Sequence, residues 1–174
     1  MENEDELSGL RGWLILVGIG VVVSPIRLLV TFLPIYTKLF SDGTWEALTS
    51  VDSEAYTPLW APVILTEVFY NTAMVLASIY LIYLFFAKHY LFPKFYIGIV
   101  AISLIVIPLD AWLVALVFPD QPILDPDTVQ EFLRVFIAGI IWVPYLLLSK
   151  RVKATFVRSK SEGTTQLTAD SSNY

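Results

Sequence analysis

Four charged residues lie deep inside long apolar segments, and the chemistry they offer is ion pairing within a membrane. Arg27 and Arg134 are cations, and Glu67 and Asp110 are anions. A helical rise of ~1.5 Å per residue, counted from the expected segment ends, places all four roughly 8–12 Å below the same surface. Asn71 follows Glu67 by one helical turn and adds a polar group to the same face. Charges inside a membrane usually face other helices and pair. The pattern therefore predicts one buried polar cluster made of these five residues.

The acidic partner of Arg27 is expected inside this cluster, because arginine and a carboxylate can form a bidentate pair that suits a buried position. We expect Glu67 or Asp110 to hold Arg27, and Arg134 to take the other carboxylate or the nearby Glu131. Glu67 is the first choice, because the first two apolar segments are neighbours in the chain. The alternative is that both arginines extend to the membrane surface without an acidic partner.

These residues do not form a pattern that is typical of an enzyme active site. A carboxylate pair that acts as acid and base needs one protonated and one ionised member, whereas two nearby arginines favour the ionised form of both. The chain has no cysteine and one histidine, His89. It therefore has no thiol nucleophile and lacks the ligand spacing of a zinc site. We expect no enzymatic activity, no metal site and no cofactor.

The elements that must position the cluster are four apolar runs. The 174-residue chain is 56% hydrophobic and 16% charged, compared with roughly a quarter charged residues in an average soluble domain. A membrane-spanning helix needs about 20 apolar residues. The sequence predicts an all-α polytopic membrane protein, an antiparallel bundle of four transmembrane helices within residues 1–158. The expected spans lie near residues 13–33, 61–87, 95–118 and 129–149. Residues 159–174 are polar and small, which predicts a disordered tail.

The orientation follows from the lysines and arginines near the span ends, which gather on the cytoplasmic side of membranes. The side that holds both termini carries Arg11, Lys88, Lys94, Lys150, Arg151, Lys153, Arg158 and Lys160. The opposite side carries Lys38 alone. We therefore expect both termini in the cytoplasm and the polar cluster in the outer half of the membrane. With a net charge of −5 and most of the chain in lipid, no nucleic-acid partner is expected.

The longest connection is expected between residues 34 and 60, as a polar loop outside the membrane. Within it the segment SDGTWEALTS is either a short helix or an irregular loop. Ser41, Asp42 or Thr44 would cap the helix. Trp45 and Leu48 would then rest on the membrane surface.

The other end of the chain carries a basic cytoplasmic end, formed by Lys150, Arg151 and Lys153. Lys150 and Arg151 are expected at the C-terminal end of the last span, where cations complement the helix dipole. Leu148, Val152 and Phe156 recur every four residues, so the helix is expected to continue along the interface with its basic face toward anionic lipid. The alternative is a cluster that only sets the orientation of the chain.

The segment IWVPYLLLSKRVKATF, residues 141–156, carries a family resemblance. With GLRGWLILVGIG at residues 9–20, and Glu67 with Asn71, it resembles a family of small bacterial inner-membrane proteins catalogued as domain-of-unknown-function family 2569. The resemblance extends from about Leu7 to Val157. It implies four membrane helices in the bacterial inner membrane and no established activity.

Two classes of function fit these features. In the first, the chain is a structural or accessory membrane protein whose polar cluster fixes helix register and which contacts lipid, a membrane-protein partner or another copy. In the second, it is a small transporter or channel subunit, for which buried ionisable groups and interrupted helices are typical. Pro25 and Pro108 each precede a buried charge by two residues, although prolines often kink membrane helices without a function. A continuous hydrated path would distinguish the second class from the first.

Overall fold

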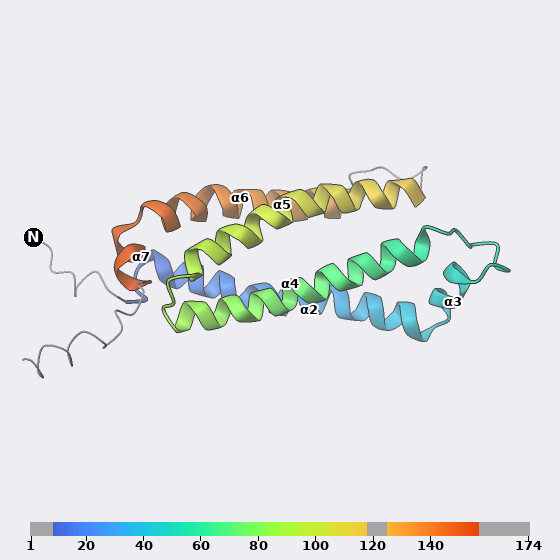
Figure 1. Ribbon diagram of the computed structural model, residues 1–174, viewed down its shortest axis with the longest axis horizontal. Coiled ribbons are helices and arrows are strands. Elements are labelled where there is room, and N and C mark those ends of the chain that lie inside the picture. Colours follow the sequence, from blue (N-terminus) through green and yellow to red (C-terminus); the bar gives the residue numbers. More distant parts are fainter. Residues whose placement is uncertain (1–8, 118–124, 157–174) are drawn as a thin grey trace, which may run out of the picture.

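The computed structural model describes residues 9–117 and 125–156, and all regular structure in these ranges is helical. Figure 1 shows the helices of these ranges in chain order: α2 (Trp13–Ser41), α3 (Thr44–Thr49), α4 (Trp60–Phe86), α5 (Phe92–Val117), α6 (Pro126–Leu148) and α7 (Lys150–Thr155). The four long helices are sufficiently long and apolar to cross a membrane. The prediction of an all-helical chain with four candidate membrane spans is confirmed. The predicted tail lies outside the described residues.

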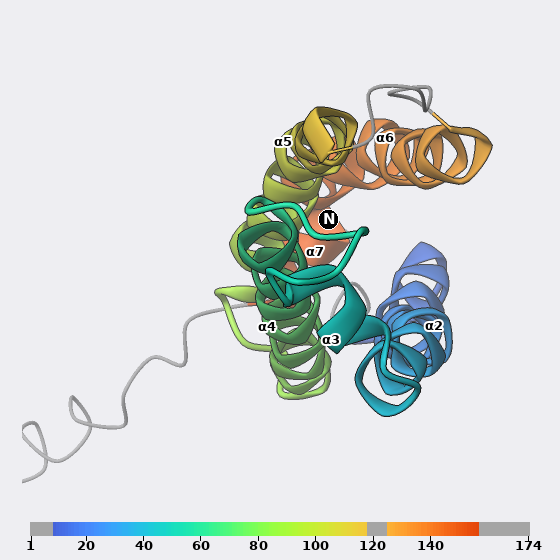
Figure 2. The same cartoon turned by 90° about the vertical axis from the view of Figure 1, so that its right-hand side faces the viewer.

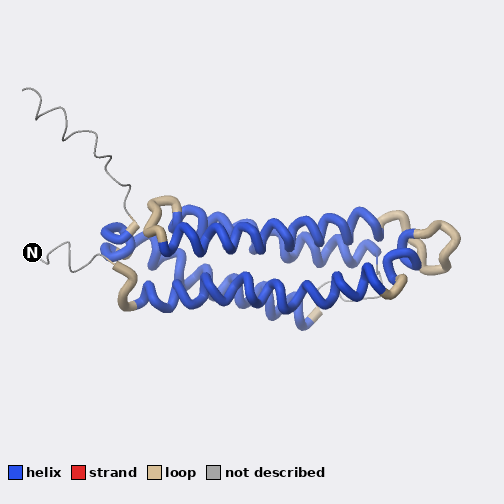
Figure 3. Tube along the Cα trace, turned by 90° about the horizontal axis from the view of Figure 1, so that it is seen from below, coloured by secondary structure: helices blue, strands red, loops and turns tan. Residues whose placement is uncertain are grey.

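The long helices run side by side along the long axis of the molecule (Figure 3). The first and last described segments meet at one end of the molecule, which we call the terminal end. There the Gly9 N–H donates to Thr155 Oγ1 at 3.1 Å. The opposite end, called the distal end, carries α3 (Figure 1). α2 packs against α4, α5 packs against α6, and contacts between α4 and α5 join the two pairs. The helices thus form two hairpins, and α2 and α6 lie on the side where the hairpins have few backbone contacts (Figure 2).

The first helix is longer than the sequence predicted, because it continues through Pro34 to Ser41. A proline inside a helix removes one backbone hydrogen bond, but the residues beyond it are held by side-chain contacts. Tyr36 stacks on Phe32 with 6.0 Å between ring centroids, and its hydroxyl accepts a hydrogen bond from α4. Phe40 packs against Trp45 of α3 at 5.3 Å. These contacts offset the lost bond, so the loop begins at residue 42, eight residues later than its expected start at residue 34.

The short helix expected as one alternative in this connection is present as α3. Gly43 precedes it with φ 83°, a left-handed conformation that glycine adopts without strain. Asp42 supports the start of α3, since its Oδ1 accepts a hydrogen bond from the Thr44 N–H at 3.0 Å. The hydrogen bonds from the Thr44 hydroxyl and N–H hold the pKa of the Asp42 carboxyl below its usual value.

The best-packed part of the molecule lies toward the terminal end. The rings of Phe92 and Phe156 stack at 4.6 Å, and Phe85 lies 5.1 Å from Phe92. α2 approaches α4 closely here, because a Cβ atom on Gly18 would lie 2.7 Å from Phe85 Cε1. The buried apolar residues of this core come from α2, α4, α6, α7, the start of α5 and the residue after α7: Leu14, Val17, Val21, Leu81, Leu84, Phe85, Phe92, Leu146, Val152 and Phe156.

The end of α6 differs from its predicted course. α6 stops at Leu148, and Ser149 is extended and caps α7 by accepting from the Val152 N–H at 3.4 Å. Leu148 is 76% exposed, whereas Val152 and Phe156 are buried. The three residues therefore do not share one face, and the prediction of a single continuous helix is wrong. The turn back toward the core lets Phe156 bury its ring against Phe92, which a straight helix would leave outside.

Lys150 and Arg151 consequently begin α7 instead of completing the last turn of α6, which contains no basic residue. The predicted stabilisation of the α6 dipole by these two cations is wrong for the same reason.

Candidate functional site

Arg27 finds its partner on α6. Its Nη2 atom donates to both carboxylate oxygens of Glu131, and the two side chains are 36% and 35% exposed. The prediction that Glu67 or Asp110 holds Arg27 is therefore wrong. The reason is the direction in which the side chains leave α2. Tyr36, which faces α4, is nine residues from Arg27, about two and a half helical turns, so the two residues point to opposite sides of α2.

Glu131 also accepts a hydrogen bond from Arg134, which lies three residues later on the same helix. This is one of the two pairings expected for Arg134. One carboxylate thus contacts two guanidinium groups, one from each hairpin. It joins α2 to α6 on the side where their backbones have few contacts. Nearer the terminal end, Trp13 and Trp142 provide a second side-chain contact between these helices, with ring centroids 6.5 Å apart.

A second polar group connects α2 to α4. The Asn71 side chain donates to the Tyr36 hydroxyl at 2.7 Å, and that hydroxyl donates to Glu67 Oε1 at 3.4 Å. Asn71 is only 7% exposed. Tyr36 was missing from the predicted cluster because the sequence argument placed it in a loop after Pro34. The recurrence of Phe32, Tyr36 and Phe40 every four residues was the available signal that the helix continues.

Asp110 on α5 lies beside this second group and interacts electrostatically with Glu67 and Tyr36. Within the described ranges, neither Glu67 nor Asp110 forms an ion pair. A side-chain hydrogen bond between Tyr70 and Ser103 adds a further polar link between α4 and α5. The predicted single cluster is therefore two adjacent groups. The first is the ion-pair network of Arg27, Glu131 and Arg134. The second contains Tyr36, hydrogen-bonded to Glu67 and Asn71, with Asp110 beside it. We call them together the polar layer: Arg27, Tyr36, Glu67, Asn71, Asp110, Glu131 and Arg134.

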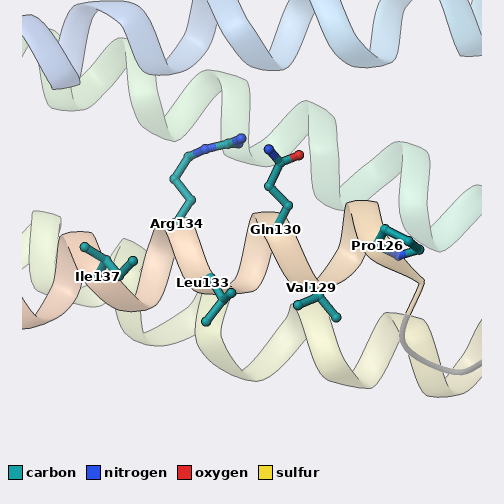
Figure 4. A pocket seen from close by; sticks show the side chains of 6 residues that line it. All are labelled: Pro126, Val129, Gln130, Leu133, Arg134 and Ile137. Carbon is teal, nitrogen blue, oxygen red and sulfur yellow. The ribbon is translucent and has the colours of Figure 1, made fainter.

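An open groove of about 670 Å³ runs beside this layer along α6. Figure 4 shows Gln130 and Arg134 projecting to one side of the helix, while Val129 and Leu133 project to the other. All of its lining residues come from α6: Pro126, Val129, Gln130, Leu133, Arg134 and Ile137. A surface formed by one helix does not enclose a small ligand, so the groove is not a binding pocket by itself.

The start of α6, from which Glu131 and Arg134 project, is fixed by a side-chain cap. Asp125 Oδ1 accepts hydrogen bonds from the Asp127 and Thr128 N–H groups at 2.8 and 3.0 Å. The Thr128 hydroxyl donates to Asp125 Oδ2 at 2.6 Å. These bonds, the Thr128 side chain first, hold the pKa of the Asp125 carboxyl below its usual value.

The two remaining questions are whether the described residues could hold a metal ion and where the predicted basic end lies. Among the described residues, no three histidine, cysteine, aspartate or glutamate side chains are grouped so that they could hold a metal ion. The residues of the predicted basic end lie on α7, where Lys150 and Lys153 are exposed and Arg151 is partly buried. They lie at the opposite end of the molecule from α3 (Figure 1).

Comparison with known proteins identifies one family. The family described as "Protein of unknown function (DUF2569)" matches residues 7–157. No curated protein matches the chain, and no solved structure matches it.

Proposed function

The chain belongs to the DUF2569 family, and we propose, from the geometry of its polar layer and its apolar core, that it is a structural or accessory protein of the bacterial inner membrane. The polar layer fixes how the two hairpins pair within an antiparallel four-helix bundle. The apolar outer faces contact lipid and a further membrane protein or a second copy.

The observation that carries this proposal is the apolar core at the terminal end. Phe85, Phe92 and Phe156 fill the space between the hairpins there, together with Leu14 and Leu84, whose side chains are fully buried. A transport path needs polar groups or water along its whole length. The ionisable residues of the layer lie in the distal half, whereas the described core between the hairpins toward the terminal end is packed with apolar side chains.

The distribution of positive charge supports an orientation with the terminal end in the cytoplasm. Among the described residues, the terminal end carries Arg11, Lys88, Lys94, Lys150, Arg151 and Lys153, while the distal end carries Lys38 in the last turn of α2. Basic residues near span ends mark the cytoplasmic side. The polar layer then lies in the outer half of the bilayer.

A small transporter or channel subunit is the second candidate. Glu67 and Asp110 favour it, because they are neighbouring carboxylates inside the predicted spans and no ion pair neutralises them within the described residues. Oligomerisation would have to supply the missing part of the path.

Single-cysteine accessibility separates the two candidates, and the chain has no cysteine of its own to interfere. Ser78 is buried in the terminal half of α4, and cysteine nearly matches its size. In sealed vesicles of either orientation, Ser78→Cys should resist a membrane-impermeant thiol reagent. Lys38→Cys and Lys88→Cys, exposed at the two ends, are the positive controls and should each react from one side. Reaction of Ser78→Cys at a rate similar to these controls would favour a hydrated path and contradict the proposal.

A further inference from the structure

Among the described residues, the charged side chains of the terminal end are all positive. Residues 9–13, 86–96 and 148–156 form it, and they contain no aspartate or glutamate. The cations come from three separate segments of the chain: Arg11 before α2, Lys88 and Lys94 around the α4–α5 connection, and Lys150, Arg151 and Lys153 on α7. We call this the basic surface.

α7 holds its cations in place because the opposite side of this helix is packed into the core. Val152 and Phe156 are buried, and the Phe156 ring packs against both Phe85 and Phe92. The Thr155 hydroxyl donates to the Gly9 carbonyl oxygen at 3.3 Å. Lys150 and Lys153 remain exposed. They are therefore displayed by an anchored helix.

The α4–α5 connection is equally well defined. The His89 N–H donates to the Leu84 carbonyl oxygen at 2.9 Å, and the Lys88 N–H donates to that of Phe85 at 3.1 Å. This pair of bonds is the Schellman motif, which ends a helix with a left-handed residue. Lys88 is that residue, with φ 50°, where glycine is the usual choice. Its side chain is exposed at the same end as α7.

Arg151 is the member of the basic surface with unused hydrogen-bonding capacity. Its Nη1 atom is buried and has no hydrogen-bond partner among the described residues, although the residue as a whole is only partly buried. A guanidinium group has five N–H donors and suits the oxygen atoms of a phosphate. An anionic group at this surface would meet this partly buried guanidinium together with exposed lysines that come from α7 and from the α4–α5 connection.

We propose that the basic surface is a binding site for the headgroup of an anionic phospholipid, formed by Arg151 together with Lys150, Lys153 and Lys88. This inference rests on the membrane location and orientation proposed above, which place the basic surface at the level of the cytoplasmic headgroups. A zwitterionic headgroup brings its own cation toward the lysines, whereas an anionic one brings a net negative charge. The site therefore discriminates between them, which a cluster that only sets orientation does not.

The test is the thermal unfolding of the full chain in detergent micelles that contain phosphatidylglycerol or phosphatidylcholine. At about ten times the Kd, phosphatidylglycerol should raise the Tm by roughly 3–6 °C more than phosphatidylcholine. The Lys150→Gln/Lys153→Gln double variant, which changes two exposed side chains, should lose at least half of this difference while keeping its Tm in phosphatidylcholine. Arg151→Gln should lose most of it. Lys38→Gln, at the distal end, is the matched control and should behave as the parent chain.

Equal Tm values in the two lipids, or a difference that survives in both α7 variants, would overturn the proposal. An equal rise with inorganic phosphate alone would also contradict it, because the site would then not require a lipid. The Tm difference between the two lipids could also appear only after Glu2, Glu4, Asp5 and Glu6 are replaced by glutamine. In that case the acidic N-terminal segment, and not a lipid, would be the ligand of the basic surface in the parent chain. None of these outcomes alters the thiol reactivity expected at Ser78, so failure here is distinguishable from failure of the proposed function.

Discussion

At the scale of single residues, Glu131 has the most consequential position in the polar layer. It accepts hydrogen bonds from Arg27 on α2 and from Arg134 on its own helix. Removing either arginine leaves the carboxylate with one partner, whereas removing the carboxylate leaves two guanidinium groups without one. A charge left unpaired in a poorly hydrated position is costly. Glu131 is therefore the least replaceable member of this network, although its sequence position near the start of a span makes it look like an ordinary interfacial acid.

Gly18 allows a direct test of the packing between α2 and α4. A Cβ atom there would lie 2.7 Å from the Phe85 ring, which is buried and held by Phe92 and Phe156. Gly18→Ala should therefore lower the free energy of unfolding by about 1–3 kcal/mol, typical of an overpacked core.

Gly20→Ala is the matched control, because a Cβ atom on Gly20 meets nothing within 4 Å. It should leave stability unchanged or raise it slightly, since alanine favours the helix. Denaturant titration in micelles, followed by circular dichroism, measures both variants. Equal stabilities for the two variants would show that the α2–α4 approach is looser than described here.

At the scale of elements, apolar runs predicted the existence of four long helices but not the direction in which their polar residues point. Depth in the membrane follows from counting residues, so it could be predicted that Arg27, Glu67, Asp110 and Arg134 lie at a similar depth. The choice of partner depends on how each helix is rotated and on which helices are neighbours, and neither follows from depth. The same limit applies to Tyr36, whose helical position depends on contacts with α4 that override the proline before it.

The N-terminus of α6 gives a prediction with a defined pH dependence. Asp125 caps this helix, so Asp125→Ala should cost about 1 kcal/mol of stability at pH 7. The pKa of Asp125 is lowered in the folded chain, and a lowered pKa gives stabilisation that is present above the unfolded pKa of about 3.9. This stabilisation is lost as the pH falls through the folded pKa.

The stability difference between parent and Asp125→Ala should therefore shrink between about pH 5 and pH 3. Unfolding of both proteins at several pH values in the same micelles measures it, and all other carboxylates cancel in the difference. Asp125→Asn, which keeps a capping oxygen without the charge, should lie between them and vary little with pH. A difference for Asp125→Ala that is constant down to pH 3 would show that the charge of Asp125 does not stabilise α6.

At the scale of the whole molecule, the two hairpins are joined differently in the two halves. Toward the terminal end an aromatic and aliphatic core joins them, and in the distal half the main link between α2 and α6 is the contact of Arg27 with Glu131. The basic surface lies at the terminal end of this arrangement, and the polar layer lies in its distal half. This separation matches a protein that contacts headgroups on one side of the membrane and maintains its helix pairing near the other.

The proposed orientation predicts the outcome of reporter fusions. A reporter that works only in the cytoplasm should be active when it is inserted within residues 87–94 or fused after Lys160, because basic residues near span ends remain on the cytoplasmic side. A reporter that works only outside the cytoplasm should be active when it is inserted within residues 43–59. Paired reporters with opposite compartment requirements, placed at each site, provide the control. The reverse pattern at all sites would contradict the orientation and, with it, the location of the basic surface.

The most direct test of the account is a double-mutant cycle between Arg27→Gln and Glu131→Gln, measured as free energies of unfolding in micelles. Both side chains are about one-third exposed, so we expect a coupling energy of about 1–2 kcal/mol instead of the 3–5 kcal/mol lost when a fully buried pair is broken. The control cycle pairs Arg27→Gln with Glu67→Gln and should show a coupling near zero, since Glu67 faces Tyr36. A clear coupling of Arg27 to Glu67, with none to Glu131, would contradict the central claim that Glu131 joins the two hairpins.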